Sequence, residues 1–347
     1  MRIAINGYGR IGRQILRAIY EYGLQDTLQV VAINGSGGVE VNALLTKRDT
    51  VHGIFGRRVE HDAESLIIDG RKIPFLDRLP IEQCKWGDYG VDLVMECTGD
   101  NVSAEKCQTH LKNGAKKVLI SAPAKGEVDA TVVYGVNHGV LTEGMRIVSN
   151  ASCTTNCLAP AAKVLVDAFG VEKGLMTTVH AFTNDQTLID VRHKDLRRAR
   201  SGAQNIIPTK TGAAKAVGLV LPQLKGKMDG FAVRVPVINV SMVDLTFVPS
   251  RPAGVGAIND AMKAASQSGP LAGVLAYSDE PLVSTDFNHT PYGSIFDATQ
   301  TRVIGDGMAK ILAWYDNEWG FSCQMLNTAR AMFGLDFKPV ALGVGLA

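Results

Sequence analysis

The sequence predicts an α/β protein with two domains, the first built on a parallel sheet between helices and the second on an antiparallel sheet. Three observations predict this class. The chain has 347 residues, which is long for a single hydrophobic core. Strand-like and helix-like segments alternate through residues 1–150, as is typical of parallel sheets. Longer strand-like runs follow, such as GLMTTVHAF (174–182) and FAVRVPVINVSMVDLTFVP (231–249), and indicate an antiparallel sheet covered on one face.

The first element, a strand over residues 2–6 (RIAIN), leads through GYGRIG into a helical pattern at 13–23. Gly7, Gly9 and Gly12 therefore lie at a strand-to-helix turn with the spacing GxGxxG. Glycines there allow a tight turn and close backbone approach, and the N–H groups that open the helix can bind a pyrophosphate. The motif alone is weak, but a second strand (LQVVAIN, 28–34) follows it and favours a Rossmann-type dinucleotide-binding domain over a merely structural turn.

Further strands continue this domain. They are VDLVMECTG (91–99), AKKVLISAPA (115–124) and ATVVYGVN (130–137), with a helix, SAEKCQTHLKNG (103–114), after the first. Because cofactors bind at the carboxyl ends of parallel strands, we expect Thr98 and Ser121 along the cofactor crevice.

A carboxylate that normally holds the ribose 2′-hydroxyl of NAD is missing after the second strand. The residues at this position are Asn34, Gly35 and Ser36, and two more glycines follow them. Without the carboxylate the repulsion of a 2′-phosphate is lost, so NADP becomes admissible. Glu40 is an alternative acid that could reach back to the ribose, and the sequence leaves this open.

The second domain contains the strand MAKILAWYDN (308–317) and a long polar segment, residues 183–212, with little periodicity. Long structureless segments in compact proteins are usually functional. We expect a dinucleotide-binding domain at 1–150, completed by a C-terminal helix at about 317–335, then a catalytic and oligomerisation domain at 151–316. Residues 336–347 read as a flexible or surface-docked extension.

The composition favours small-molecule chemistry. There are 36 Lys and Arg residues against 34 Asp and Glu, and they are interspersed, so no basic surface for nucleic acid or a membrane is indicated. No apolar run approaches the roughly 20 residues of a membrane-spanning helix, and MRIAINGYGR does not resemble a signal peptide. We expect a cytoplasmic protein with neither a nucleic-acid nor a membrane partner.

Two of the six cysteines lie four residues apart in SNASCTTNC (149–157), where a strand turns into a helix. A metal site would need about four ligands, and no second Cys or His cluster lies nearby, so no metal is expected. A disulfide between these positions is geometrically poor and improbable in the cytosol. We interpret Cys153 as a nucleophile whose pKa is lowered at the helix start, and Cys157 as core packing.

A thiolate nucleophile also needs a proton acceptor. His180, near the end of the strand-like run LMTTVH, is the candidate. A single histidine on a strand is more often structural, so spacing alone leaves its role open.

The segments INGYGRIG, ECTG, SNASCTTNCLAP, TTVHAFTNDQ, HKDLRRAR, PTKTGAAKAVGLVLP, RVPVINVS and WYDNEWG together strongly resemble the phosphorylating glyceraldehyde-3-phosphate dehydrogenase family. The resemblance runs from about residue 2 to about residue 334. It implies that Cys153 attacks the aldehyde of glyceraldehyde 3-phosphate and that His180 takes the proton as hydride leaves for NAD(P). Inorganic phosphate then releases 1,3-bisphosphoglycerate from the thioester, in a reversible reaction.

The resemblance also assigns binding residues and a homotetramer. Substrate and phosphate contacts are implied for Ser152, Thr154, Thr183, Asp185, Arg198, Thr211, Gly212 and Arg234. Cofactor contacts are implied for Gly7, Gly9, Arg10, Ile11, Gly12, Asn34, Gly35, Ser36, Arg78, Thr98, Ser121 and Asn317, the last against the nicotinamide carboxamide.

The chain departs from NAD-selective members at two places. They carry Asp where this chain has Gly35, and a Leu-Pro pair where it has Val191 and Arg192. A lost anion and a gained cation both favour a 2′-phosphate, so we predict that Arg192 contacts the cofactor and that NADP is used, alone or alongside NAD. Alternatively, Arg192 points to water.

Two other functions stay open at this point. Erythrose-4-phosphate dehydrogenase is a close rival, although Thr183 and the segment TGAAK (211–215) fit the glyceraldehyde enzyme better. A non-catalytic paralogue that acts as a binding protein is the other, and nothing in the chain recommends it.

Overall fold

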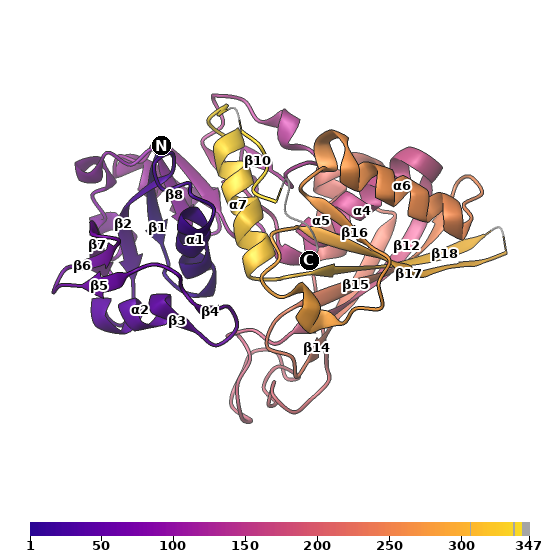
Figure 1. The fold of residues 1–347 in the computed structure, drawn as a ribbon, viewed down its shortest axis with the longest axis horizontal. Helices are drawn as coiled ribbons and strands as arrows, with labels where there is room; N and C mark the ends of the chain where they lie inside the picture. Colours follow the sequence, from indigo (N-terminus) through magenta and orange to yellow (C-terminus); the bar gives the residue numbers. More distant parts are fainter. Residues whose placement is uncertain (306, 336, 342–347) are drawn as a thin grey trace. The chain divides into compact units, whose positions relative to one another are not determined.

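The computed structural model describes residues 1–305, 307–335 and 337–341 of the chain. Within these residues the chain forms two compact units (Figure 1). Unit 1 holds Met1–Val132, His138–Ala151 and Met325–Phe337, and unit 2 holds Val133–Asn137, Ser152–Gln324 and the described residues from Lys338 onward. The expected extension at 336–347 therefore lies mostly outside the described residues.

Unit 1 contains a twisted sheet with the strand order β10-β11-β9-β8-β1-β2-β7-β6-β5. The strands from β10 to β7 pair in parallel, and β6 and β5 add an antiparallel edge. The parallel strands are buried and apolar, as sheets covered on both faces require. The bounds are β1 (Arg2–Asn6), β2 (Gln29–Gly35), β5 (Val59–His61), β6 (Ser65–Ile68), β7 (Arg71–Asp77), β8 (Leu93–Glu96), β9 (Lys117–Ile120), β10 (Ala130–Thr131) and β11 (Ile147–Ser149).

Helices α1 (Arg10–Glu21), α2 (Gly38–Lys47) and α3 (Ala104–Lys112) connect these strands, with a small hairpin of β3 (Arg48–Asp49) and β4 (Gly53–Ile54) after α2. The last helix, α7 (Trp319–Ala331), ends in this unit. One core cluster lies between β8, β9 and α3 and includes Trp86, Val94 and Leu111. The predicted Rossmann-type fold of the first half is confirmed.

The turn between β1 and α1 needs glycine for space. Gly7 has φ +96°, and a Cβ atom on it would lie 2.6 Å from the backbone of Cys97. A Cβ on Gly12 would lie 2.2 Å from the carbonyl oxygen of Gly7. The turn therefore packs backbone against backbone with the chain after β8 and with the first turn of α1, which leaves no room for a side chain at Gly7 or Gly12.

Unit 2 is a sheet with the order β13-β14-β12-β15-β18-β17-β16. Helices α4, α5 and α6 pack on one another and on the strands, and they cover one face of this sheet (Figure 1). The bounds are α4 (Cys153–Phe169), β12 (Val171–Ala181), β13 (Ile207–Thr209), α5 (Ala213–Val220), β14 (Met228–Val235), β15 (Ser241–Pro249), α6 (Val255–Gln267), β16 (Leu275–Ser278), β17 (Ser294–Ile304) and β18 (Met308–Tyr315).

The predicted antiparallel sheet needs a correction. Most neighbours are antiparallel, but β12 pairs with β14 in parallel and β16 pairs with β17 in parallel. The connection from β12 to β14 is long enough to cross over, because it contains the polar segment, β13 and α5. The strand-like run at 231–249 also breaks between Val235 and Ser241, where Pro236 cannot donate to a ladder and Val240 has φ +66°.

The polar segment forms neither helix nor strand between residues 182 and 206. Near the chain end, Ala341 is fully buried in a cluster with Val240, Phe287 and Ile295, so this part of the extension is docked on unit 2. No helix in the described part of the chain is both long enough and apolar enough to cross a membrane.

Gly12→Ala should destabilise the protein by about 1–3 kcal/mol, because the added methyl group overlaps the Gly7 carbonyl and forces the backbone apart. Gly9→Ala is the matched control, since its Cβ would meet no atom within 4 Å. Thermal unfolding without added cofactor measures the difference. Equal melting temperatures for the two variants would contradict the packing described here.

Candidate active site

The start of α4 presents Cys153. Ser152 is the N-cap residue, and its Oγ accepts a hydrogen bond from Thr155 N at 3.1 Å. Cys153 is the first helical residue and is partly exposed, whereas Cys157 is fully buried with its Sγ 3.7 Å from Ala313 O. The prediction that Cys157 packs in the core is confirmed.

His180, on β12, faces this cysteine. Its Nε2 lies 3.6 Å from Cys153 Sγ, and its Nδ1 lies 2.7 Å from the carbonyl oxygen of Ala181. The carbonyl can only accept and favours a proton on Nδ1, which leaves the lone pair of Nε2 for the thiol; Arg234 Nη1 can only donate, lies 2.8 Å from the same Nδ1 and favours the opposite tautomer. Tyr315 packs its ring edge-on against the imidazole, with the centroids 5.8 Å apart. The sequence places Cys153 and His180 in separate segments, and the structure brings them together.

Burial controls the protonation of this pair. It raises the pKa of the Cys153 thiol, and the charge of Arg234 and hydrogen bonds from Thr154 oppose the shift only in part. Burial also lowers the pKa of His180 to about 3, and the charge of Arg234 adds to that shift. The expectation that the pKa of Cys153 is lowered at the helix start is therefore wrong. The proton can leave sulfur for Nε2, because the two charges so formed lie beside each other.

Tyr315 is a residue that sequence reasoning missed. Its hydroxyl lies 2.9 Å from both Thr154 Oγ1 and Thr178 Oγ1, and the ring supports His180. Thr154 was expected to bind phosphate, but its hydroxyl is bound to Tyr315 and is nearly fully buried. In the sequence, the only signal for this role is the alternation along β18, which predicts an inward position for Tyr315 at the end of the strand.

Arg234 lies next to His180 because the two residues are paired in the register of β12 and β14. Arg234 Nη1 is 2.8 Å from His180 Nδ1, and it donates to Ala181 O at 2.9 Å and to Thr183 Oγ1 at 3.2 Å. The guanidinium is partly buried, and burial lowers its pKa. A permanent positive charge is therefore held at the edge of the Cys153–His180 pair.

Arg198 adds a second guanidinium from the polar segment. It bonds the carboxylate of Asp185, which also accepts from Thr183 Oγ1. Burial opposes ionisation of Asp185, but the Thr183 hydrogen bond and the charges of Arg198 and Arg234 outweigh it and lower the pKa. One carboxylate thus faces the charges of two arginines and bonds one of them, which leaves a positive site suited to phosphate.

The segment 207–212 closes this positive site. Arg198 Nε donates to Thr209 Oγ1 at 3.0 Å, and Thr209 was missed by sequence reasoning although it precedes Thr211 by two residues. Thr211 and Gly212 lie at the start of α5, where Thr211 Oγ1 accepts a hydrogen bond from Ala213 N. Their N–H groups supply further donors for an anion.

Asn317 is held by Ser241, another residue that the sequence did not reveal. Ser241 Oγ donates to Asn317 Oδ1 at 2.8 Å and accepts from Ala181 N at 3.1 Å. Because Oδ1 is occupied, the amide nitrogen of Asn317 is the group available to a ligand.

The cofactor residues line a groove of about 1,150 Å³ in unit 1. Of those predicted, Gly7, Gly9, Asn34, Gly35, Ser36, Arg78 and Thr98 line it, whereas Arg10, Ile11, Gly12 and Ser121 do not. Arg10 instead pairs with the buried carboxylate of Asp49 at 3.0 Å. At Gly9, which also lines the groove, a Cβ would meet no atom within 4 Å, so open space remains at the turn and suits a pyrophosphate.

Two predicted determinants of cofactor choice lie elsewhere. Glu40 is exposed in the first turn of α2 and lines a separate hollow, so the alternative that it replaces the missing ribose carboxylate is not supported. Arg192 is exposed in the polar segment of unit 2. Arg197 and Arg200 are exposed as well, and Arg200 pairs with Asp190.

Comparisons with known proteins agree with this geometry. The family model "Glyceraldehyde 3-phosphate dehydrogenase, NAD binding domain" matches residues 1–104, and "Glyceraldehyde 3-phosphate dehydrogenase, C-terminal domain" matches residues 152–317. Curated glyceraldehyde-3-phosphate dehydrogenases are similar over 332 residues, covering 96% of this chain and 98% of each relative. They include a plasmid-encoded protein of Cupriavidus necator (58% identical), a Pseudomonas aeruginosa protein (58%) and a Zymomonas mobilis protein (53%).

His180→Asn should slow alkylation of Cys153 by iodoacetamide at pH 7 by about tenfold or more. The variant thiol can lose its proton only to solvent, with a pKa raised by burial, so the rate profile should also move to higher pH. His61→Asn, at an exposed histidine of unit 1, is the control and should leave the profile unchanged. Mass spectrometry of the labelled peptide follows the rate. Identical profiles for His180→Asn and the unaltered protein would show that His180 does not accept this proton.

Proposed function

The chain belongs to the glyceraldehyde-3-phosphate dehydrogenase family of oxidoreductases, and from this premise we propose that it is the phosphorylating enzyme. It oxidises glyceraldehyde 3-phosphate with a nicotinamide cofactor and inorganic phosphate to 1,3-bisphosphoglycerate, reversibly. The observation that carries this proposal is the 3.6 Å contact between Cys153 Sγ and His180 Nε2 beside the guanidinium of Arg234.

The first step is nucleophilic attack. Cys153 passes its proton to His180 Nε2, and the sulfur bonds to the aldehyde carbon, which forms a thiohemiacetal. The backbone N–H of Cys153 at the start of α4 stabilises the oxyanion. His180 returns this proton to the oxyanion and is neutral again; it then takes the proton back from the thiohemiacetal hydroxyl as the hydride leaves, which leaves a thioester on Cys153. When bound, the nicotinamide cofactor accepts the hydride that leaves this carbon.

The second step is phosphorolysis. Inorganic phosphate attacks the thioester carbon, the carbon–sulfur bond breaks, and His180 returns its proton to the sulfur. Arg198, Arg234 and Thr183 supply charged and neutral donors for the phosphate oxygens, and Thr211 and Gly212 supply more at the start of α5. This reaction needs two anion sites, one for the substrate phosphate and one for the attacking phosphate, and these residues are divided between them.

The cofactor would be held by the groove residues of unit 1 and by Asn317, and we propose that NADP is accepted. Gly35 carries no carboxylate, and Glu40 does not line the groove, so no acid on β2 or α2 repels a 2′-phosphate there. A Cβ on Gly35 would lie 2.8 Å from Phe75 Cζ and 2.9 Å from Tyr8 Cβ. The aromatic pair therefore occupies the space that an aspartate at this position would need. The exposed cation of Arg192 completes the proposed preference, because in the family's tetramer its segment reaches toward the adenosine ribose of a neighbouring subunit's cofactor.

We further propose a cytoplasmic homotetramer. The sheet face of unit 2 that lies opposite its helices exposes large apolar side chains, among them Leu175 (68% exposed) and Phe231 (49%). They border a hollow of about 1,130 Å³. Apolar surface of this extent is typical of subunit interfaces, and a second copy of the chain is the occupant expected in this family.

The substrate assignment has a direct test. The protein should reduce NAD(P) with glyceraldehyde 3-phosphate only when inorganic phosphate is present, and should turn over erythrose 4-phosphate less well. Cys153→Ser should lower kcat on the order of 10³-fold, because serine is a poor nucleophile beside a histidine of low pKa. Cys157→Ser is the matched control. Phosphate-independent oxidation, or a preference for the four-carbon sugar, would refute the proposal.

The cofactor assignment is tested by kcat/KM with NADP and with NAD. Arg192→Ala should lower the NADP value by about 5- to 100-fold and change the NAD value much less, because one charge-assisted contact to the 2′-phosphate is lost. Arg200→Ala removes a nearby charge and serves as the control. Gly35→Asp is not a clean test, since it also displaces Tyr8 and Phe75. A strong NAD preference in the unaltered enzyme would defeat the NADP proposal.

A further inference from the structure

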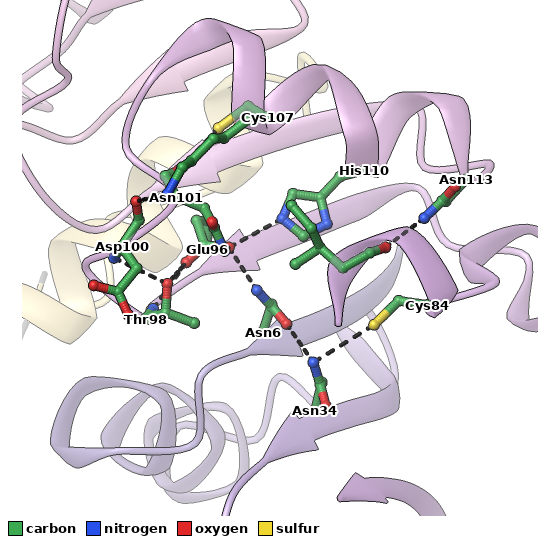
Figure 2. Close-up of polar contacts among 12 residues, drawn as sticks. Asn6, Asn34, Cys84, Glu96, Thr98, Asp100, Asn101, Cys107, His110 and Asn113 are labelled. Carbon is green, nitrogen blue, oxygen red and sulfur yellow. Dashed lines mark hydrogen bonds and ion pairs between the residues drawn. The ribbon is translucent and has the colours of Figure 1, made fainter. Parts of the chain in front are cut away.

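A polar cluster centred on the buried carboxylate of Glu96 lies beside the cofactor groove, and Glu96 itself has no role in the chemistry above. We call it the Glu96 network; Figure 2 shows its members Asn6, Asn34, Glu96, Thr98, Asn101 and His110. Trp86, which contacts His110, is the remaining member. Glu96, the last residue of β8, has no exposed surface, and neither has His110 on α3. Burial of a carboxylate is costly unless donors surround it.

The groups around Glu96 are donors. Asn6 Nδ2 donates to Oε2 at 2.6 Å, and Thr98 donates to Oε1 through its backbone N (2.9 Å) and its hydroxyl. His110 Nε2 lies 3.0 Å from Oε2. Trp86 Nε1 can only donate, and it lies 2.9 Å from His110 Nδ1. The proton of His110 is therefore on Nε2, and the imidazole is a further donor to Glu96.

This donor set keeps Glu96 ionised. Burial alone would raise its pKa, but the hydrogen bonds from His110 and Thr98 outweigh burial and hold the pKa below its usual value. An amide in place of the carboxylate would turn its own N–H group toward one of these donors, so that two donors would face each other.

The charge also fixes groups that do not touch Glu96. Because Asn6 Nδ2 points to Glu96, Asn6 Oδ1 faces the other way and accepts from Asn34 Nδ2 at 2.8 Å. Asn34 Oδ1 then accepts from Leu79 N at 3.0 Å. Asn34 Nδ2 also donates to Leu79 O at 2.9 Å. The buried carboxylate therefore sets the orientation of Asn6, and Asn6 together with the Leu79 backbone holds Asn34.

The ends of this network line the cofactor groove. Asn34 at the end of β2 and Thr98 after β8 both line the groove, as does Asn6 between them, whereas Glu96 does not. We propose that Glu96 is a positioning residue for NAD binding, which holds contacts on two different strands in their binding orientation without touching the cofactor. This inference rests on the NAD-binding domain of the family and on the contacts proposed for Asn34 and Thr98, and it does not depend on the sugar substrate.

The test is NAD affinity of the full-length protein, measured by isothermal titration calorimetry. Glu96→Gln should raise the Kd for NAD by about 10- to 100-fold, because the glutamine amide opposes the donors of Asn6 or His110, weakens the hold on Thr98 and frees Asn6 to turn away from Asn34. The double variant Asn6→Asp with Glu96→Gln exchanges donor and acceptor between the two positions, and the carboxylate introduced in place of the Asn6 amide can still accept from Asn34. It should recover at least part of the lost affinity.

Trp86→Phe separates positioning from general stability. It removes a donor on the side of His110 that faces away from Glu96, so it should lower the melting temperature while the Kd for NAD stays within about threefold. Should Glu96→Gln fail to fold, Glu96→Asp keeps the charge and withdraws it from Asn6 and Thr98, and should raise the Kd by at least about threefold.

Three results would overturn the inference: NAD affinity within twofold of the unaltered protein in Glu96→Gln, an unchanged Kd in Glu96→Asp, or an equal loss of affinity in Trp86→Phe. An unaltered protein that binds NAD but does not oxidise glyceraldehyde 3-phosphate would sink the proposed function and leave this inference standing.

Discussion

The chemistry of this protein depends on the burial of a thiol against an imidazole. Neither Cys153 nor His180 is charged by itself in this environment, since burial raises the pKa of the thiol and lowers that of the ring. A proton can still move over the 3.6 Å between Sγ and Nε2, because the resulting charges neutralise each other. Arg234 makes the site asymmetric: its charge opposes an isolated imidazolium and favours the thiolate, so nucleophile and base act as one unit.

Secondary structure explains why these groups meet. The first turn of α4 presents the sulfur, and the parallel register of β12 with β14 places His180 opposite Arg234. The sequence indicated the cysteine at a helix start and a histidine on a strand, and the family resemblance joined them. It did not indicate the parallel pairing, because the intervening segment of about 25 residues without helix or strand gives no directional information. Thus the contact of Arg234 with His180 could not be predicted from spacing.

The supporting residues were missed for a related reason. Tyr315 joins Thr154 on a helix to Thr178 on a strand, and Ser241 joins Ala181 to Asn317. Each has an ordinary place in an alternating strand, and only the tertiary arrangement reveals its partners. The glycine turn of unit 1 was predictable, since steric exclusion at Gly7 and Gly12 acts within a short strand-turn-helix unit. Local constraints can therefore be read from sequence, whereas hydrogen bonds across distant segments cannot.

The two buried acid–base sites show what decides the charge of an ionisable side chain. Glu96 has no exposed surface and Cys153 is partly exposed, yet the pKa of Glu96 is lowered and that of Cys153 is raised. The difference lies in the donors. Asn6, Thr98 and His110 surround Glu96, whereas the sulfur, a weak acceptor, depends mainly on one histidine that must first gain a proton. A carboxylate fixed by donors suits a permanent framework beside the groove. A thiol with one exchangeable partner suits a nucleophile that must be formed and reprotonated in each turnover.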